Sequence, residues 1–125
     1  MLTDDTLGSL RLAAAAAHDK KAFRLTAIDV DGLTSYTDAF LICSASNERQ
    51  VGAIVDAVQS RLRSEGKRPL HVEGETRSDW VLMDYGDIVV HVFTEERRDY
   101  YALDSLWGDA DRLDAAGLGL GLEKP

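Results

Sequence analysis

Two aspartates, Asp29 and Asp31, come nearest in this chain to residues whose type and spacing could do chemistry. They stand in the motif IDVDG at 28–32. On a β-strand, residues two apart point to the same side, so an Asp-x-Asp pair there presents two carboxylates together. Metal-assisted phosphoryl transfer requires such a pair, because carboxylate oxygens hold the metal ion that stabilises the transferring group. The pair therefore raises the hypothesis of a metal-dependent enzyme.

Two enzyme classes would use this pair, and in this sequence each lacks other parts of its site. Phosphatases with an Asp-x-Asp-Gly motif also need a later lysine and a distal acid cluster, whereas Asp87 is followed by IVVH, with no second acid close by. A nucleotidyltransferase using Asp29, Asp31 and Asp87 would need a Gly-Ser phosphate loop. Gly8-Ser9 lies instead inside an expected helix. Solvated strand-end carboxylates are favoured, and the metal-dependent nucleotidyltransferase- or phosphatase-like enzyme is kept as the alternative.

The other nucleophiles and metal ligands are scattered along the chain. The single cysteine, Cys43, stands in the apolar run FLIC, which is typical of a small buried thiol. His18, His71 and His91 share no metal-ligand spacing with one another or with Cys43. His91 alternates in phase with Phe93, which favours a structural histidine. We expect no catalytic residue, no metal site and no cofactor.

Length and charge narrow the class of protein. A chain of 125 residues is long enough for one domain with its own core. Its 22 acidic and 14 basic residues give a net charge of −8, which opposes broad contact with nucleic acid and suits a basic protein partner. The sequence has no apolar run of membrane-spanning length, and its acidic first residues do not resemble a signal peptide. We therefore expect a cytoplasmic protein without membrane contact.

The hydrophobic pattern predicts a mixed α/β domain. Its helices are expected at 3–21 with Thr3 or Asp4 as the cap, between the cap Asn47 and Gly66 with Gln50 as a capping-box partner, and after the cap Thr94. Its strands are expected at 23–30, 39–44, 70–73, 80–83 and 88–93. The order is αββαβββα. Consecutive strands without intervening helices favour a mixed five-stranded sheet with helices packed on it. The domain is expected to span residues 1–110, followed by a flexible C-terminal tail at 111–125.

A surface for a partner is predicted on the hairpin formed by the last two strands. Trp80 and Leu82 share strand parity, so their side chains emerge on one face, and Tyr85 is expected at the turn beside them. Asp84 and Asp87 flank this tyrosine. Large apolar side chains with an acidic rim are typical of an interface with a basic partner. Alternation does not decide whether Trp80 and Leu82 face the partner or a helix of the same chain.

An ordered set of motifs in this chain resembles the ribosomal silencing factors, also called the Iojap-related family. The resemblance covers about residues 5 to 110. Its motifs are Thr37-Asp38, Ser46, Gln50-Val51, Glu73-Gly74, Trp80-Val81-Leu82, Asp84-Tyr85-Gly86-Asp87, Val90-His91-Val92-Phe93, Glu96, Arg98, Leu103 and Leu106-Trp107-Gly108-Asp109-Ala110. The loop 76–79 and the Gly-Leu tail depart from the family pattern, without touching the hairpin and helix motifs.

The resemblance implies a translation repressor that is not an enzyme. Such proteins bind the large ribosomal subunit through its basic ribosomal protein fourteen and sterically block the small subunit when nutrients are scarce. The family fold is related to that of nucleotidyltransferases, here without the active site. By this resemblance, Trp80, Leu82 and Tyr85 would be apolar anchors, and Asp84 and Asp87 would accept from lysine or arginine. Little nucleic-acid contact and a homodimer of the free protein are further expectations, and an unrelated adaptor is the remaining alternative.

Overall fold

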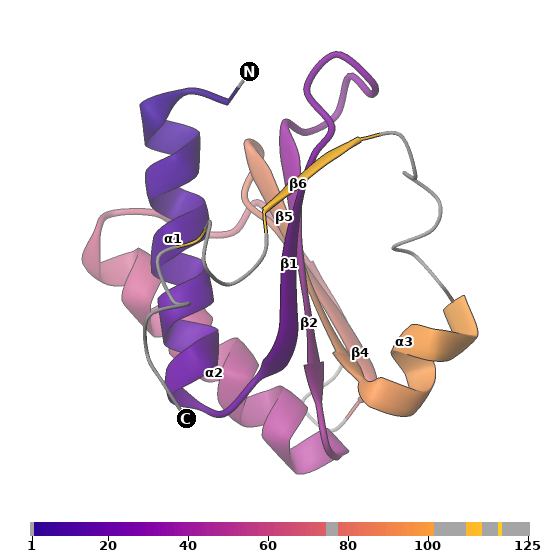
Figure 1. Cartoon of the computed structure of the whole chain (residues 1–125). Helices are drawn as coiled ribbons and strands as arrows, with labels where there is room; N and C mark the ends of the chain where they lie inside the picture. Colours follow the sequence, from indigo (N-terminus) through magenta and orange to yellow (C-terminus); the bar gives the residue numbers. More distant parts are fainter. Residues whose placement is uncertain (1, 75–77, 102–109, 114–117, 119–125) are drawn as a thin grey trace.

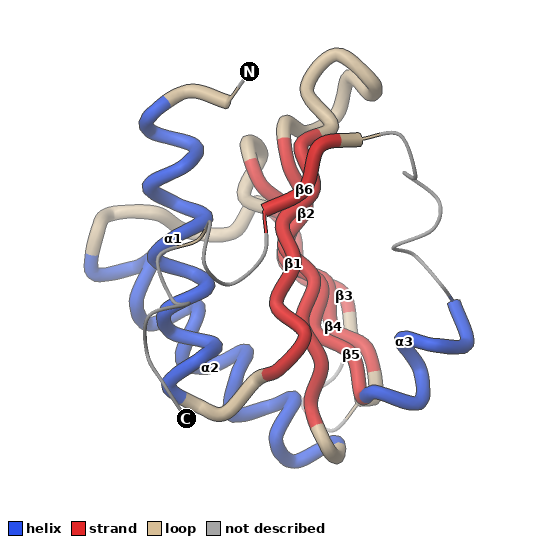
Figure 2. The backbone as a smooth tube through the Cα atoms, in the orientation of Figure 1, coloured by secondary structure: helices blue, strands red, loops and turns tan. Residues whose placement is uncertain are grey.

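The structure is a computed structural model that describes residues 2–74, 78–101, 110–113 and 118, with the backbone alone for 99–101. A twisted sheet separates two layers of helix (Figures 1 and 2). The elements in chain order are α1 (Asp4–Asp19), β1 (Phe23–Asp29), β2 (Ala39–Ala45), α2 (Glu48–Ser64), β3 (His71–Glu73), β4 (Trp80–Asp84), β5 (Ile88–Thr94), α3 (Glu95–Tyr101) and β6 (Asp111–Leu113). This arrangement confirms the predicted mixed α/β fold.

The sheet has the strand order β3-β4-β5-β2-β1-β6. Its two central strands, β2 and β5, are parallel, and each of the other pairs is antiparallel. All seven residues of β2 are buried, as are the first six of β5. Burial on both faces explains why these strands read as continuous apolar runs rather than as alternating sequences.

The expected count of five strands is wrong, because β6 adds a sixth. Its residues pair antiparallel with Ala27, Ile28 and Asp29 of β1. Three residues are too few to show an alternating pattern, so no local signal predicts this strand. β6 lies in the segment 111–125 that is expected to be a flexible tail. The rest of that segment lies outside the described residues except Leu118, which is buried.

The two long helices begin at caps that the sequence predicts. The Thr3 hydroxyl accepts from the backbone N–H of Thr6 at 3.1 Å, and the Asn47 side chain accepts from Gln50 N–H at 2.8 Å. The Gln50 side chain also bonds backward, but to the N–H of Ser46 at 2.6 Å. These bonds satisfy backbone donors that the first turn of a helix leaves without partners.

Side-chain alternation divides the core into two clusters, one on each face of the sheet. We call the side covered by α1 and α2 the α1/α2 face, and the opposite side, where α3 packs, the α3 face (Figure 1). Small and branched residues of the two long helices pack on the α1/α2 face, including Ala13, Ala17, Val51, Ile54 and Val58. The core of the α3 face consists of Ile28, Val30, Phe40, Ile42, Val89 and Phe93, with Trp80, Leu82 and Ala110 packed against it.

Gly74 directly follows β3, and its backbone packs closely against the start of β4. Its φ is +103°, and a Cβ there would lie 2.5 Å from the carbonyl oxygen of Trp80. We expect Gly74→Ala to lower the free energy of unfolding by at least about 2 kcal/mol, because the left-handed backbone and the clash both oppose a side chain. Urea unfolding measures this. Gly8→Ala, inside α1 with open space around the new methyl, is the control and should gain about 1 kcal/mol.

Candidate partner-binding site

The structure decides which way Trp80 and Leu82 point. Both side chains are half-buried and pack against the cluster on the α3 face, whereas Val81 and Met83 between them are buried in the cluster on the α1/α2 face. Trp80 and Leu82 therefore do not face α1 or α2. They lie on the α3 face, which the two long helices do not cover, and both remain partly exposed there.

Trp80 is held by aromatic neighbours on β5. Its ring stacks on Phe93 with centroids 5.2 Å apart and an angle of 17° between the planes. Its indole Nε1 donates a hydrogen bond to Nδ1 of His91 at 3.2 Å. Because an indole N–H only donates, Nδ1 of His91 is the unprotonated nitrogen of a neutral imidazole. The bond lets the indole remain half-buried without leaving its donor unsatisfied.

Further aromatic residues that the sequence pattern did not single out extend from Trp80 across the sheet. Phe40 meets His91 edge-on with centroids 5.3 Å apart, and Tyr36 lies 6.1 Å from Phe40. Tyr36 is 61% exposed. Phe40 and His91 become neighbours through the parallel pairing of β2 with β5, in which Ile42 is opposite His91. These aromatic residues could be grouped from the sequence only if the order of the strands in the sheet were known, and the alternation of side chains along a strand does not reveal that order.

The turn between β4 and β5 places Tyr85 on the other face. The expectation that Tyr85 stands beside Trp80 and Leu82 is wrong, because its ring packs against the cluster on the α1/α2 face. Its hydroxyl oxygen is buried with no hydrogen-bond partner among the described residues. Burial raises the pKa of Tyr85, and the nearby charge of Arg63 partly offsets this rise. Side chains alternate between the two faces of a strand, so Tyr85 lies on the same face as Val81 and Met83 of β4.

The two acidic residues of the turn have separate structural contacts. Asp84 accepts from the backbone N–H of Gly86 at 2.8 Å, which closes the turn, and Gly86 has a φ of +92°. Asp87 accepts from the hydroxyl of Thr6, in the first turn of α1, at 3.4 Å. Both carboxylates are partly exposed at the end of the hairpin. They remain accessible to a basic group, although each also supports its own loop.

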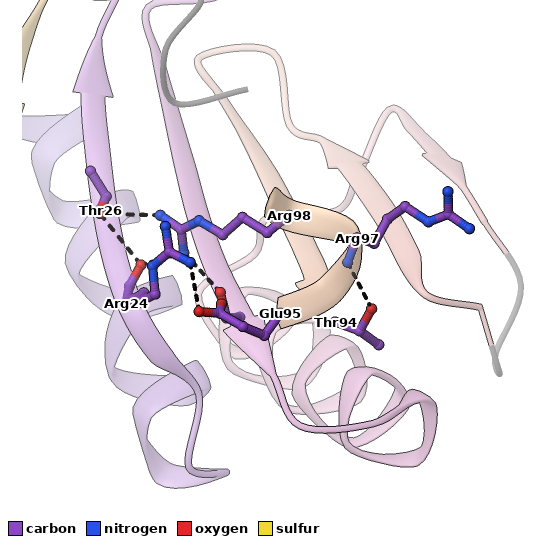
Figure 3. Close-up of polar contacts among 7 residues, drawn as sticks. Arg24, Thr26, Thr94, Glu95, Arg97 and Arg98 are labelled. Carbon is purple, nitrogen blue, oxygen red and sulfur yellow. Dashed lines mark hydrogen bonds and ion pairs between the residues drawn. The ribbon is translucent and has the colours of Figure 1, made fainter. Parts of the chain in front are cut away.

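A buried arginine attaches α3 to strands β1 and β2 of the sheet (Figure 3). Arg98 is 2% exposed, and its guanidinium donates to the carbonyl oxygen of Arg24 at 2.6 Å and to the Ser44 hydroxyl at 3.0 Å. Arg24 has an unusual φ of +51° and forms an ion pair with Glu95 at 2.6 Å. That ion pair is partly exposed and contributes little by itself. The buried hydrogen bonds of Arg98 are the stronger attachment.

A second contact joins the start of α3 to the start of β4. The Arg97 side chain binds the Asp79 carboxylate at 2.8 Å, and Thr94 N–H donates to the carbonyl oxygen of Asp79 at 2.9 Å. Thr94 caps the helix through a 3.4 Å bond from Arg97 N–H, as the sequence predicts. Because Asp79 directly precedes Trp80, these bonds also fix the backbone that carries the indole.

The residues proposed for enzymatic chemistry are not assembled into a metal site. The Asp29 carboxylate accepts from the backbone N–H of Asp31 at 3.0 Å, a local turn contact. In the part of the chain that the structure describes, no group of three or more His, Cys, Asp or Glu residues could hold a metal ion. Burial raises the pKa of Cys43 to about 12, although the charge of Arg98 acts in the opposite direction, so its thiol stays protonated. The alternative of a metal-dependent enzyme finds no support in this geometry.

None of the helices that the structure describes is long and apolar enough to cross a membrane.

The buried imidazole of His91 predicts a pH dependence of stability. Burial lowers the pKa of His91 from 6.5 to about 4. Above pH 6.5 the residue is neutral in both folded and unfolded chains; below it the unfolded chain binds a proton that the folded chain does not. We therefore expect this residue to lower the free energy of unfolding by about 2 kcal/mol between pH 7.5 and pH 5, with further loss toward pH 4.

Urea unfolding across this range, for the wild type and for His91→Leu, isolates the contribution. Between pH 7.5 and pH 5 the free energy of unfolding of the variant should fall by about 2 kcal/mol less than that of the wild type. An NMR titration of the His91 ring in the folded wild type should have a midpoint well below pH 6.5. Parallel pH profiles for the two proteins would contradict the prediction.

Comparisons with known proteins agree with the resemblance in the sequence. The family model described as "Ribosomal silencing factor during starvation" matches residues 3–124. The chain is 42% identical to the ribosomal silencing factor RsfS of Bacillus subtilis over 105 residues, which cover 84% of this chain and 89% of the relative. It is 32% identical to the chloroplastic protein Iojap of Zea mays, covering 81% of this chain and 44% of that longer protein.

A solved structure has the same fold. A crystal structure of a Chromobacterium violaceum protein superposes with a TM-score of 0.78 at 34% identity, covering 86% of this chain and 88% of the other. A second crystal structure, of a Bacillus halodurans protein, gives a TM-score of 0.71 at 41% identity, covering 78% of this chain and 91% of that one. The match of the family model over nearly the whole chain, with relatives at this identity, shows that the protein belongs to the ribosomal silencing factor family.

Proposed function

We propose that this protein binds the large ribosomal subunit through its basic ribosomal protein fourteen and sterically blocks the small subunit from joining. Translation would then fall when nutrients are limiting. Several relatives carry the name ribosomal silencing factor, which supports a role at the ribosome. The observation that carries the proposal is the half-buried pair Trp80 and Leu82 on the sheet face that α1 and α2 leave uncovered.

The proposed contact combines apolar anchors with acidic groups. Trp80 and Leu82 offer apolar area that a partner can bury, and anchors of this kind commonly dominate the affinity of an interface. Asp84 and Asp87 offer carboxylates to lysine or arginine at the end of the hairpin. Tyr85 would meet the partner only from the hairpin turn, because its ring packs toward the α1/α2 face rather than beside Trp80 and Leu82. Truncating Tyr85 to alanine would therefore change the core as well as the contact.

Charge complementarity supports a protein rather than an RNA partner. The net charge of −8 favours encounter with a basic ribosomal protein and opposes close approach to phosphates. We therefore propose little direct contact with nucleic acid, no cofactor and no catalytic activity. A cytoplasmic location follows from the proposed role, and a homodimer of the free protein is part of the same proposal. No specific observation favours a second function.

Sedimentation of purified protein with isolated large subunits, followed by addition of small subunits, tests the mechanism. We expect co-sedimentation with large subunits and a loss of joined ribosomes. Leu82→Ala should weaken binding by about thirtyfold, corresponding to about 2 kcal/mol for a central anchor. Leu12→Ala is the matched control, since Leu12 is also partly buried but lies on α1, on the other side of the sheet.

Two outcomes would overturn this proposal. If the wild-type protein fails to sediment with large subunits at modest salt, the ribosomal role is wrong. If Leu82→Ala and Leu12→Ala bind equally well, the contact lies elsewhere on the molecule.

The acidic contribution has a separate test in Asp84→Asn and Asp87→Asn. Asparagine keeps an oxygen that can accept from Gly86 N–H or from the Thr6 hydroxyl, so each loop should remain intact while its charge is lost. We expect the double variant to associate with large subunits more slowly at low salt and to show a weaker salt dependence than the wild type. Stopped-flow association at several salt concentrations measures both. An unchanged salt dependence would remove these carboxylates from the contact.

A further inference from the structure

His91 is a polar residue within an aromatic and aliphatic layer, and its position needs a physical reason. It is 5% exposed, near the middle of β5 on the α3 face. A buried polar group without a partner costs free energy, so such groups are normally hydrogen-bonded. For His91 the bond described in this structure is the 3.2 Å contact between its Nδ1 and the indole Nε1 of Trp80.

The neighbours of His91 restrict the orientation of its ring. Phe40 packs edge-on against it at 5.3 Å between centroids, and Phe93 lies 6.0 Å away with nearly parallel planes. The Trp80 ring is also roughly parallel, with centroids 6.1 Å apart and 26° between the planes. In the β4–β5 register Leu82 is opposite His91 and Trp80 is opposite Phe93, so Trp80 reaches His91 along the diagonal. The imidazole thus presents one fixed acceptor to the indole.

We propose that His91 is a positioning residue, which holds the Trp80 indole in the orientation that contacts the partner. The inference rests on the proposed function, because it assigns a role within that contact. Stacking on Phe93 fixes the plane of the indole, and the hydrogen bond to Nδ1 fixes which edge of the indole turns inward. A side chain already held in its bound orientation loses less conformational freedom when the partner binds, so affinity rises without a new contact.

Two substitutions separate the hydrogen bond from packing. His91→Leu introduces an apolar side chain of similar size and removes the hydrogen-bond acceptor. His91→Asn is smaller, yet its side-chain oxygen stands near the place of Nδ1 and can still accept from the indole. If His91 acts only by filling space, His91→Leu should weaken binding less than His91→Asn does. If His91 acts through its hydrogen-bond acceptor, His91→Asn should weaken binding less.

A double-mutant cycle tests whether His91 acts through Trp80. We expect His91→Leu to weaken binding to large subunits by about fivefold or more in the wild-type background, with His91→Asn recovering most of that loss. In a Trp80→Phe background, which has no indole N–H, His91→Leu should change binding less than twofold. Leu12→Ala serves as the control for general destabilisation. Equal losses in both backgrounds would overturn the proposal.

A measurement without ribosomes keeps the inference distinct from the proposed function. The chain has two tryptophans, Trp80 and Trp107, so Trp80→Phe assigns the indole N–H resonance of Trp80 by its disappearance. In His91→Leu this resonance should shift and its proton should exchange with solvent faster, whereas His91→Asn should retain most of the protection. An unchanged indole resonance in His91→Leu would overturn the positioning role even if the wild type binds. If His91→Leu loses the indole protection but the wild type does not bind large subunits, His91 does position the indole, and the proposed function is wrong. The role of this positioning in a contact with the ribosome would then be wrong as well.

Discussion

The parallel pairing of β2 with β5 is the constraint on which the rest of this structure depends. These strands run side by side over seven residue pairs at the centre of the sheet, and both are buried on both faces. A parallel pair needs a long connection, which α2 and the β3–β4 hairpin supply between the two strands. It also needs cover on both sides. The two long helices lie along one side, and the short α3 packs on the other (Figure 1).

That unequal cover explains where the candidate site lies. Apolar and small residues make up most of the contacts on the α1/α2 face, whereas the α3 face includes a buried arginine and a buried histidine with specific hydrogen-bond partners. Arg98 bonds a backbone carbonyl and a hydroxyl on two strands, and His91 bonds the Trp80 indole. Satisfied buried polar groups tend to select one arrangement over its competitors. The face with less helical cover is therefore held in place by directed bonds.

The sequence predicted the parts of this fold that depend on local pattern. The positions of strands β2 and β5, the caps Thr3 and Asn47 and the shared parity of Trp80 and Leu82 all agree with the structure. Non-local features were not predictable in this way. β6 is too short to show a period, and the aromatic row follows from a strand order that alternation does not contain. Parity groups Trp80 with Leu82, but only the position of the helices decides which face they occupy.

Two reactive side chains of the central strands are committed to structure. The Cys43 thiol is fully buried and its pKa is raised to about 12, so it is not a thiolate at neutral pH. His91 has a pKa lowered to about 4, and its unprotonated nitrogen already accepts from Trp80. A general base needs that lone pair for the substrate, so His91 cannot serve as one without releasing the indole. The lone pair that would be needed for acid–base chemistry is instead bonded to Trp80, the residue that we propose meets the partner, so this face is better suited to the proposed recognition than to catalysis.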